Sequence, residues 1–317
     1  MRKRVLGRTG LEISVMGMGT GGLDPLGQKS GRPVQEMHSL LRRAKDLGVN
    51  YFDTSPGYLD SEEILGTALS EYPRDEIVLS TKIALASEAS SEITIMTPQQ
   101  VRESVDSSLR RLKTDYLDIM LMAVSGPEFF ERVTQDHLPV LEQCKKEGKI
   151  RFIGSSEQTR SDGSHEWLIK VLLTGTVDVA MVGHNMINQS AEQTIFPYCV
   201  EHNIGVLNIF TVRNLFWNPL RLREVIADLK FRGKITGDGI PDEGPMDWLL
   251  TDGIETLVEA AYRYALHSDG VTAVMCGTIH ETELEQNVRY YEKEQLPEHL
   301  ISRLHELFGD INEAIGN

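Results

Sequence analysis

Three residues near the ends of two predicted strands could act together as a proton-transfer group. Asp53 lies at the end of the strand expected over 50–54, Tyr58 follows it in the next loop, and Lys82 ends the strand expected over 77–82. An unpaired ammonium is costly to bury, so Lys82 needs a charged partner, and Asp53 on the adjacent strand supplies it. On their own, these two residues are equally compatible with a structural ion pair.

Tyr58 adds a group that can move a proton. An ammonium close to a phenol favours the phenolate form. A phenol tuned in this way can give a proton to a developing alkoxide, or accept one from an alcohol in the reverse direction. From the residues alone, a catalytic and a structural role for the cluster both stay open.

The elements that must position these residues alternate along the chain. Short apolar runs, expected to be strands, alternate with segments of helical spacing, and such strands pair in parallel and are buried on both faces. Eight of them after an N-terminal hairpin at 4–14 favour a closed (β/α)8 TIM barrel over an open doubly wound sheet. The strands are expected at 15–19, 50–54, 77–82, 116–122, 150–154, 177–182, 205–210 and 271–275.

The helices between and after these strands complete a single α/β domain over residues 1–317. The sequence predicts helices at 34–47, 62–69, 98–112, 129–147 with a break near Pro139, 166–173, 193–202, 221–230, 248–267, 282–290 and 297–307. The barrel is thus expected to carry extra C-terminal helices. The irregular stretch 233–247 is long for a compact domain, and we expect it to be mobile or to form a lid.

The composition limits the class of partner. Acidic residues outnumber basic ones 47 to 32, for a formal charge of −15, which disfavours a nucleic acid or an anionic membrane. Three widely separated cysteines indicate neither a disulfide framework nor a metal site. No apolar region follows the charged start at residues 1–8, so we expect no secretory signal, and the sequence has no apolar run of 18 residues. We therefore expect a cytoplasmic protein with a small-molecule substrate and no metal, whose oligomeric state the sequence does not indicate.

Several segments resemble the aldo-keto reductase family. The stretch 52–58 reads FDTSPGY and is followed by SEEILG at 61–66, which is similar to the family signature. Further similar segments follow the family order over nearly the whole chain: RVLGRTGL at 4–11, STK at 80–82, DYLD at 115–118, GKIRFIG at 148–154, and a late Gly277-Thr278 followed by Asn287. The resemblance implies nicotinamide-dependent carbonyl reduction or alcohol oxidation, with Tyr58 as general acid/base, Lys82 tuning it and Asp53 holding Lys82.

One member of the family's catalytic set is missing. The family usually has a histidine at the end of strand four, where Ala123 stands here. A methyl group cannot donate a hydrogen bond, and losing one such donor costs about 10²–10³ in rate. Three explanations stay open: Ser125, His184 or Asn208 takes over the role, the substrate brings its own hydroxyl, or the reaction is not ordinary carbonyl reduction.

The cofactor positions depart from the family pattern as well. Ser156 matches the serine that holds the nicotinamide carboxamide, but Glu157 replaces the usual asparagine beside it. Met181 replaces a glutamine, Phe210 would supply a ring face, and Arg213 could meet the pyrophosphate. The candidate cofactor-binding residues are Gly19, Thr20, Ser156, Met181, Phe210, Arg213, Gly277, Thr278, Glu283, Gln286 and Asn287.

The charge near the expected ribose site favours NAD(H) over NADP(H). Glu283 stands where the family often has arginine, with Glu281 and Glu285 nearby. These carboxylates would repel a 2′-phosphate, which prefers cations. If they are only a solvated helix face, a lysine or arginine from elsewhere could still bind that phosphate.

We therefore expect an oxidoreductase that transfers hydride between NAD(P)(H) and a sugar-like or other polyhydroxy carbonyl or alcohol, in carbohydrate metabolism. Polar residues expected at the barrel mouth, such as Asn185, Asn208 and Arg213, favour such a substrate. Two alternatives stay open. One is a redox-neutral lyase, dehydratase or epimerase with tightly bound NAD, and the other is a nicotinamide-binding regulatory subunit.

Overall fold

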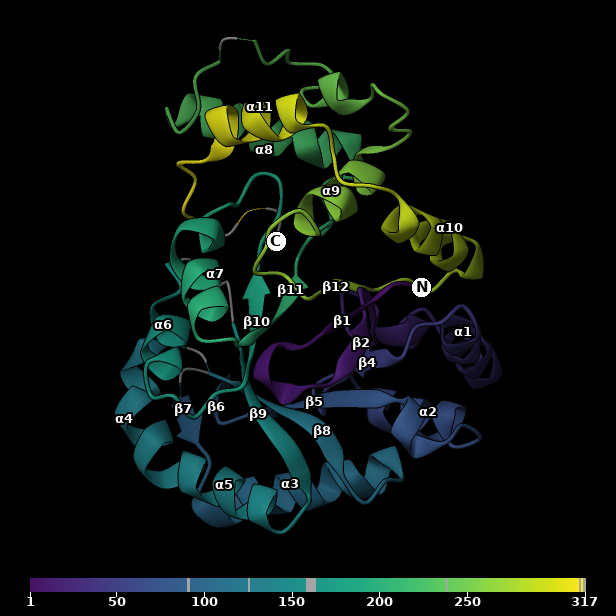
Figure 1. The fold of residues 1–317 in the computed structure, drawn as a ribbon, viewed down its shortest axis with the longest axis vertical. Helices are drawn as coiled ribbons and strands as arrows, with labels where there is room; N and C mark the ends of the chain where they lie inside the picture. Colours follow the sequence, from purple (N-terminus) through teal and green to yellow (C-terminus); the bar gives the residue numbers. More distant parts are fainter. Residues whose placement is uncertain (90–91, 125, 158–163, 238, 314, 316–317) are drawn as a thin grey trace.

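Eight parallel strands close into a barrel in the computed structural model, which describes all residues except 90–91, 125, 158–163, 238, 314 and 316–317 (Figure 1). The strand order around the barrel is β10-β11-β12-β3-β4-β5-β8-β9. The strands are β3 Met16–Gly19, β4 Tyr51–Asp53, β5 Val78–Ala84, β8 Leu117–Ala123, β9 Ile150–Ser156, β10 Val179–Gly183, β11 Gly205–Ile209 and β12 Ala273–Cys276. Each overlaps a predicted strand, so the prediction of a (β/α)8 barrel is confirmed.

The helices of the described chain are α1 Val34–Asp46, α2 Ser61–Leu69, α3 Pro98–Leu112, α4 Phe130–Arg132, α5 Leu138–Lys146, α6 Glu166–Leu172, α7 Ala191–Glu201, α8 Pro219–Phe231, α9 Leu257–Ala265, α10 Glu281–Glu292 and α11 Glu298–Phe308. Most of them surround the barrel, while α8 and α11 lie in a layer beyond it (Figure 1). The break expected near Pro139 is a π-helical turn, Val133–His137, that directly precedes α5. Thr97 caps α3 through a capping box with Gln100, as the Thr-Pro start of that helix indicates.

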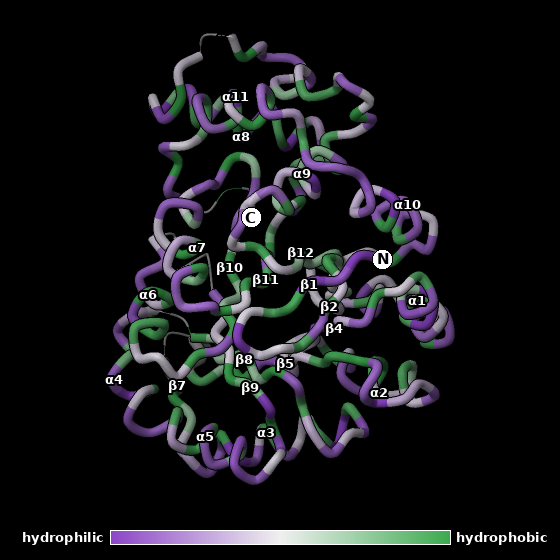
Figure 2. Tube along the Cα trace, in the orientation of Figure 1, coloured by the Kyte–Doolittle hydropathy of each residue, from purple (hydrophilic) through white to green (hydrophobic). Residues whose placement is uncertain are grey.

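Alternation along the strands separates two sets of side chains. Inward residues such as Tyr51, Ile119, Leu121 and Leu207 fill the barrel, while their neighbours pack outward against the helices. Figure 2 shows the hydrophobic positions along β10 and β11. Because the interior is filled, the barrel is a packed core rather than a channel, and ligands must bind at one of its ends.

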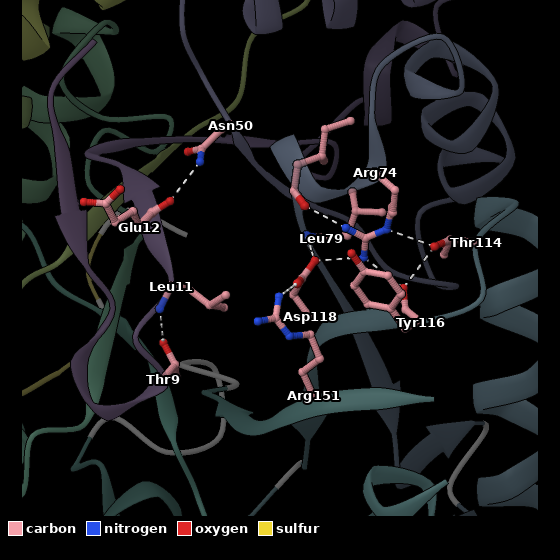
Figure 3. Close-up of polar contacts among 11 residues, drawn as sticks. Thr9, Leu11, Glu12, Asn50, Arg74, Leu79, Thr114, Tyr116, Asp118 and Arg151 are labelled. Atoms are coloured by element: carbon pink, nitrogen blue, oxygen red, sulfur yellow. Dashed lines mark hydrogen bonds and ion pairs between the residues drawn. The ribbon is translucent and has the colours of Figure 1, made fainter. Parts of the chain in front are cut away.

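The N-terminal end of the barrel is closed by a hairpin and a polar network. The hairpin is formed by β1 Lys3–Val5 and β2 Glu12–Ser14. Near it, the buried carboxylate of Asp118 accepts hydrogen bonds from Arg74 at 2.8 Å, Arg151 at 2.7 Å and the Leu79 amide at 2.9 Å (Figure 3). These bonds tie the starts of β5, β8 and β9 together and leave the C-terminal end as the open face.

Two segments differ from the prediction. The helix expected over 248–267 is a short 3₁₀ turn, Asp247–Leu249, followed by α9 from Leu257. Asp252 and Gly253 adopt left-handed backbone angles between them, with φ of 51° and 77°, which no α-helix accommodates. A hairpin of β6 Ala86–Ala89 and β7 Glu92–Ile95 was not predicted, because its short strands interrupt the strand-to-helix alternation between β5 and α3.

The described residues of 233–247 are anchored in a second hydrophobic core. Ile235, Ile240 and Met246 are buried there among residues of α8 and α11, which lie together beyond α9 (Figure 1). Lys230 donates to the Ile240 carbonyl at 2.7 Å. Residues from the loops that leave β10 and β11 join the same core, so this layer is attached on the C-terminal side of the barrel.

The part of the chain that the structure describes contains no helix long and apolar enough to cross a membrane. Within the same residues, no group of three or more His, Cys, Asp and Glu side chains could hold a metal ion. All three cysteines are buried and unpaired with one another.

Candidate active site

Asp53 and Lys82 form a buried ion pair at the C-terminal end of the barrel. The register pairs Gly19 with Asp53 and Asp53 with Ser80, so the ends of β3, β4 and β5 meet there. Nζ of Lys82 contacts Oδ2 of Asp53 and donates to the Thr54 carbonyl at 3.1 Å. Burial acts to lower the pKa of Lys82, but its interactions with the Asp53 carboxylate and with Tyr58 outweigh this effect and raise that pKa. Lys82 is therefore a fixed positive charge.

The second oxygen of the Asp53 carboxylate is also held. Oγ of Ser80 donates to Oδ1 of Asp53 at 2.7 Å, and the Tyr51 hydroxyl lies 2.8 Å from the same Oγ. Tyr51 is fully buried in the barrel core, and burial raises its pKa well above the usual value. The carboxylate thus has a hydrogen-bond partner on each oxygen. This fixes its orientation and therefore the position of the Lys82 ammonium that it holds.

Tyr58 is half-buried at the barrel mouth, and Nζ of Lys82 lies 5.1 Å from the centre of its ring. The loop that carries it is held by the Tyr58 amide, which donates to the Ser55 carbonyl at 3.0 Å, and by Gln28, which donates to the Tyr58 carbonyl at 3.1 Å. A Cβ atom at Gly21 would lie 2.5 Å from the ring, so the glycine leaves the space that the phenol occupies. The structure therefore brings Asp53, Tyr58 and Lys82 together.

Two methyl groups line the position where the family histidine would stand. Ala123 pairs with Ala84 on one side and with Ser156 on the other. Ala84 is exposed at the mouth, and Ala123 is buried. Ser125, one candidate to replace the histidine, lies outside the described residues.

The other two candidates point away from the mouth. Met181 faces the barrel interior and Val182 the outer core, and His184 continues the outward alternation. Its ring is stacked on Tyr264 with centroids 5.4 Å apart and has no exposed surface. Asn208 is outward as well, and its amide donates to Thr211 at 2.8 Å and to the His184 carbonyl at 3.2 Å. Neither side chain lies where it could donate to a substrate oxygen beside Ala123.

Burial lowers the pKa of His184 to about 3, and the charges of His165 and His305 add to this effect. Oε1 of Glu192 lies 3.3 Å from its Nε2, but the Glu192 carboxylate already serves Tyr264 at 3.0 Å and His305 at 3.1 Å. Burial therefore keeps the ring neutral in the folded protein.

This shift predicts acid destabilisation. The unfolded chain binds a proton at His184 below about pH 6.5 while the folded chain does not, so stability falls as pH falls. We expect this one group to remove on the order of 2–3 kcal/mol of unfolding free energy between pH 6.5 and about pH 4.5. His184→Phe keeps an aromatic ring between Phe196 and Tyr264 without the titration. Urea unfolding at both pH values should show a smaller loss for the variant, and parallel losses would contradict the prediction.

The predicted nicotinamide positions lie at adjoining strand ends. Ser156 pairs with Met181 across β9 and β10, and both are buried. Met181 is part of the barrel-interior core and has no exposed surface, so it supports the mouth from below. At the end of β11, the guanidinium of Arg213 lies 3.4 Å from the centre of the Phe210 ring. Phe210 and Arg213 both have left-handed backbone angles, with φ of 65° and 51°.

The predicted ribose loop follows β12, next to the Gly19-Thr20 end of β3. Gly277 is exposed, and Oγ1 of Thr278 donates to Glu283 at 2.5 Å. Gln286 donates to the Tyr290 hydroxyl, and the amide of the buried Asn287 donates to Sγ of Cys276 at 3.2 Å. Thr20 is fully buried and its hydroxyl donates to Thr54 at 2.9 Å. Asn287 and Thr20 therefore hold the loop ends in place.

Two arginines that the sequence analysis did not single out also reach this loop. Arg32 donates to the Ile279 carbonyl and pairs with Glu36 at 3.3 Å. Arg43 pairs with Glu285 at 2.6 Å and with Glu281 at 3.6 Å. Only the barrel closure, which sets β3 beside β12, brings them there.

The charge and type of these groups fit a nicotinamide dinucleotide. Arg213 offers a cation for a pyrophosphate, Ser156 a hydroxyl for an amide, and the loop after β12 a hydroxyl and carboxylates for ribose oxygens. The set lies around the same barrel mouth as Tyr58 and Lys82, so a hydride carrier and a proton donor could face one substrate there.

Comparisons with known proteins agree with the barrel fold. A sequence model of the Aldo/keto reductase family matches residues 15–308. L-galactose dehydrogenase of Arabidopsis thaliana is 29% identical over 303 residues, which are 90% of this chain and 86% of that protein. The NADH-specific methylglyoxal reductase of Escherichia coli is 31% identical over 220 residues, 65% of this chain and 66% of that protein. The holo form of an aldo-keto reductase from Bacillus halodurans has a TM-score of 0.74 at 26% identity, covering 96% of each chain.

Proposed function

The chain belongs to the aldo/keto reductase family of NAD(P)-dependent oxidoreductases, and on that premise we propose that it transfers hydride between NAD(H) and a sugar-like polyhydroxy carbonyl or alcohol. The observation that supports this most directly is the cluster of Tyr58, Lys82 and Asp53 at the open end of the barrel. The nicotinamide, when bound, supplies or accepts the hydride.

Tyr58 is the proton donor in carbonyl reduction and the acceptor in alcohol oxidation. Its hydroxyl protonates the carbonyl oxygen as negative charge develops there. Lys82 stabilises the phenolate left behind, because its ammonium is held beside the ring by Asp53 and the Thr54 carbonyl. Gly21 keeps the ring's position free of any side chain.

We infer the substrate class from the residues that the structure describes around Ala123. Ala84 and Ala123 offer no hydrogen-bond donor beside the reacting oxygen, and His184 and Asn208 face away from it. A hydroxyl on the carbon next to the carbonyl can supply the missing donor from the substrate itself. The name of the Arabidopsis relative points to a hexose, and that of the E. coli relative to a small two-carbonyl compound, which supports an oxygen-rich substrate.

The cofactor preference follows from local charge. Two arginines, Arg32 and Arg43, reach the loop after β12, but four carboxylates (Glu36, Glu281, Glu283 and Glu285) accompany them. Arg43 pairs with Glu285 and Arg32 lies within ion-pair distance of Glu36, so carboxylates compete with a 2′-phosphate for both arginines. An excess of negative charge favours the ribose hydroxyls of NADH over the phosphate of NADPH.

A fluorescence titration with NADH and NADPH, on the wild type and on Glu283→Arg, tests this proposal. We expect the wild type to bind NADH about tenfold or more tightly than NADPH, and Glu283→Arg to gain about tenfold in NADPH affinity. Glu298→Arg, which makes the same charge change at the start of α11, is the matched control and should leave the ratio unchanged.

Turnover with a panel of hydroxyaldehydes and sugars completes the test. Net oxidation of NADH in step with product formation supports a reductase or dehydrogenase. Product formation without net NADH consumption would instead support the redox-neutral alternative, and absence of binding by either nucleotide would contradict the proposed function.

A further inference from the structure

A buried chain of polar side chains runs behind the ends of β9, β10 and β11. It starts at Glu157, directly after Ser156, and passes through His165, Ser190 and Asn188 to Asn185. These five side chains are all at most 9% exposed. Polar groups buried together in this way are costly unless each has a partner, so the chain is a built feature of the fold.

The first half of the chain connects β9 and β10 to α7. Oε2 of Glu157 accepts from the Gly183 amide at 2.8 Å, while Oε1 contacts Nδ1 of His165. Nε2 of His165 lies 2.8 Å from Oγ of Ser190, at the start of α7. The Glu157 amide also donates to the Met181 carbonyl at 3.0 Å. Glu157 thereby fixes the strand ends that carry Ser156 and Met181.

The second half connects α7 to the end of β11. Oγ of Ser190 donates to Oδ1 of Asn188 at 2.8 Å, and the backbone N–H of Asn188 donates to Oδ1 of Asn185 at 3.0 Å. The side-chain amide of Asn185 donates to the Phe210 carbonyl at 3.2 Å. Phe210 has left-handed backbone angles, and the Arg213 guanidinium lies over its ring.

The order of donors distinguishes this chain from a nucleophile triad. Carboxylate, imidazole and hydroxyl follow one another, but Ser190 gives its only proton to Asn188 and so accepts from His165. A serine bonded in this direction is not being activated as a nucleophile. The chain's effect must therefore be on geometry.

We propose that Glu157, His165, Ser190, Asn188 and Asn185 are positioning residues that hold the nicotinamide-facing wall of the barrel mouth in one conformation. The inference rests on the proposed function, because Ser156, Phe210 and Arg213 are the cofactor positions that the chain joins. It also explains the glutamate at 157, whose side chain turns outward to His165 and not toward the mouth.

Ser190→Ala breaks the chain at its middle with the loss of one oxygen atom. Ser190 makes no side-chain capping bond to α7, so the helix start is otherwise unaffected. We expect the Kd for NADH to rise about tenfold, while the single-turnover rate at saturating NADH changes by less than about threefold. Ser190→Thr keeps the hydroxyl and should restore most of the affinity. Ser14→Ala removes another buried, hydrogen-bonded serine hydroxyl at the other end of the barrel and should leave the Kd unchanged.

Hydrogen exchange without nucleotide separates this inference from the proposed function. The amides of Gly183, Ile187 and Asn188 donate to side chains of the chain. Their exchange should accelerate about tenfold or more in Ser190→Ala and not in Ser14→Ala. Unchanged exchange, or faster exchange with wild-type NADH affinity, would overturn the positioning role. If the wild type binds neither nucleotide, the proposed function fails, and the role of the polar chain in cofactor positioning fails with it. This holds even if the exchange rates show that Ser190 is coupled to the amides of Gly183, Ile187 and Asn188.

Discussion

Tyr58→Phe is expected to lower the rate of carbonyl reduction by about 10²–10⁴-fold while leaving the affinity for NADH close to that of the wild type. The substitution removes one hydroxyl and keeps the ring that lies against Gly21 and Lys82. Lys82 remains paired with Asp53, so the charge at the mouth does not change. The loss should therefore fall on kcat, measured as NADH oxidation at saturating nucleotide.

Tyr72→Phe is the matched control for this experiment. Tyr72 is also half-buried and hydrogen-bonded, to Asp46 at 3.0 Å, but it lies in the turn after α2, away from the barrel mouth. Its variant should keep wild-type kcat. If Tyr58→Phe reduced carbonyls within about threefold of the wild type, Tyr58 would not be the proton donor, and Lys82 would be the next group to test.

The part of the site that can be predicted from the sequence is the part that lies at or near strand ends. Asp53 ends β4, and Lys82 lies two residues before the end of β5. Both short apolar strands could be located from the sequence, and barrel topology places their C-terminal ends on one face. Tyr58 follows Asp53 by five residues, so its loop could not carry it far. Local sequence thus determines the cluster once the barrel is known.

For two candidate side chains, the direction in which one strand residue points decides whether it can reach the site. His184 and Asn208 lie at the ends of β10 and β11, but a one-residue change in strand alternation decides between mouth and outer core. The sequence around them offers no polar and apolar alternation from which that facing could be read, because parallel strands are buried on both sides.

Contacts between segments that are distant in sequence could not be predicted, for a different reason. Arg43 meets Glu285 across 242 positions of sequence, and Ser190 meets His165 across 25. The sequence separation of the two residues predicts neither contact, because each contact depends on how helices and loops pack around the closed barrel. The buried polar chain behind Ser156 therefore emerged only from the structure.

The missing histidine leads to the second large expected effect, an increase in activity. In Ala123→His, the new imidazole would stand beside Ser156 and Ala84 at the mouth, where it could donate to the substrate oxygen. A donor placed there is worth about 10²–10³ in rate. We expect kcat/KM for a plain aldehyde to rise about 10²-fold, with a much smaller gain for the matching 2-hydroxyaldehyde, whose hydroxyl already fills the role.

The pair of substrates and two further variants make this expectation specific. The wild type should prefer the 2-hydroxyaldehyde by about 10²-fold, and Ala123→His should nearly abolish that preference. Ala123→Leu adds bulk without a donor, and Ala84→His adds the same ring one strand away. Neither should reproduce the gain, and thermal unfolding of all three shows whether overpacking, which costs about 1–3 kcal/mol, has impaired the fold. Equal wild-type rates on both aldehydes, with no gain in Ala123→His, would show that the substrate does not replace the histidine with its own hydroxyl.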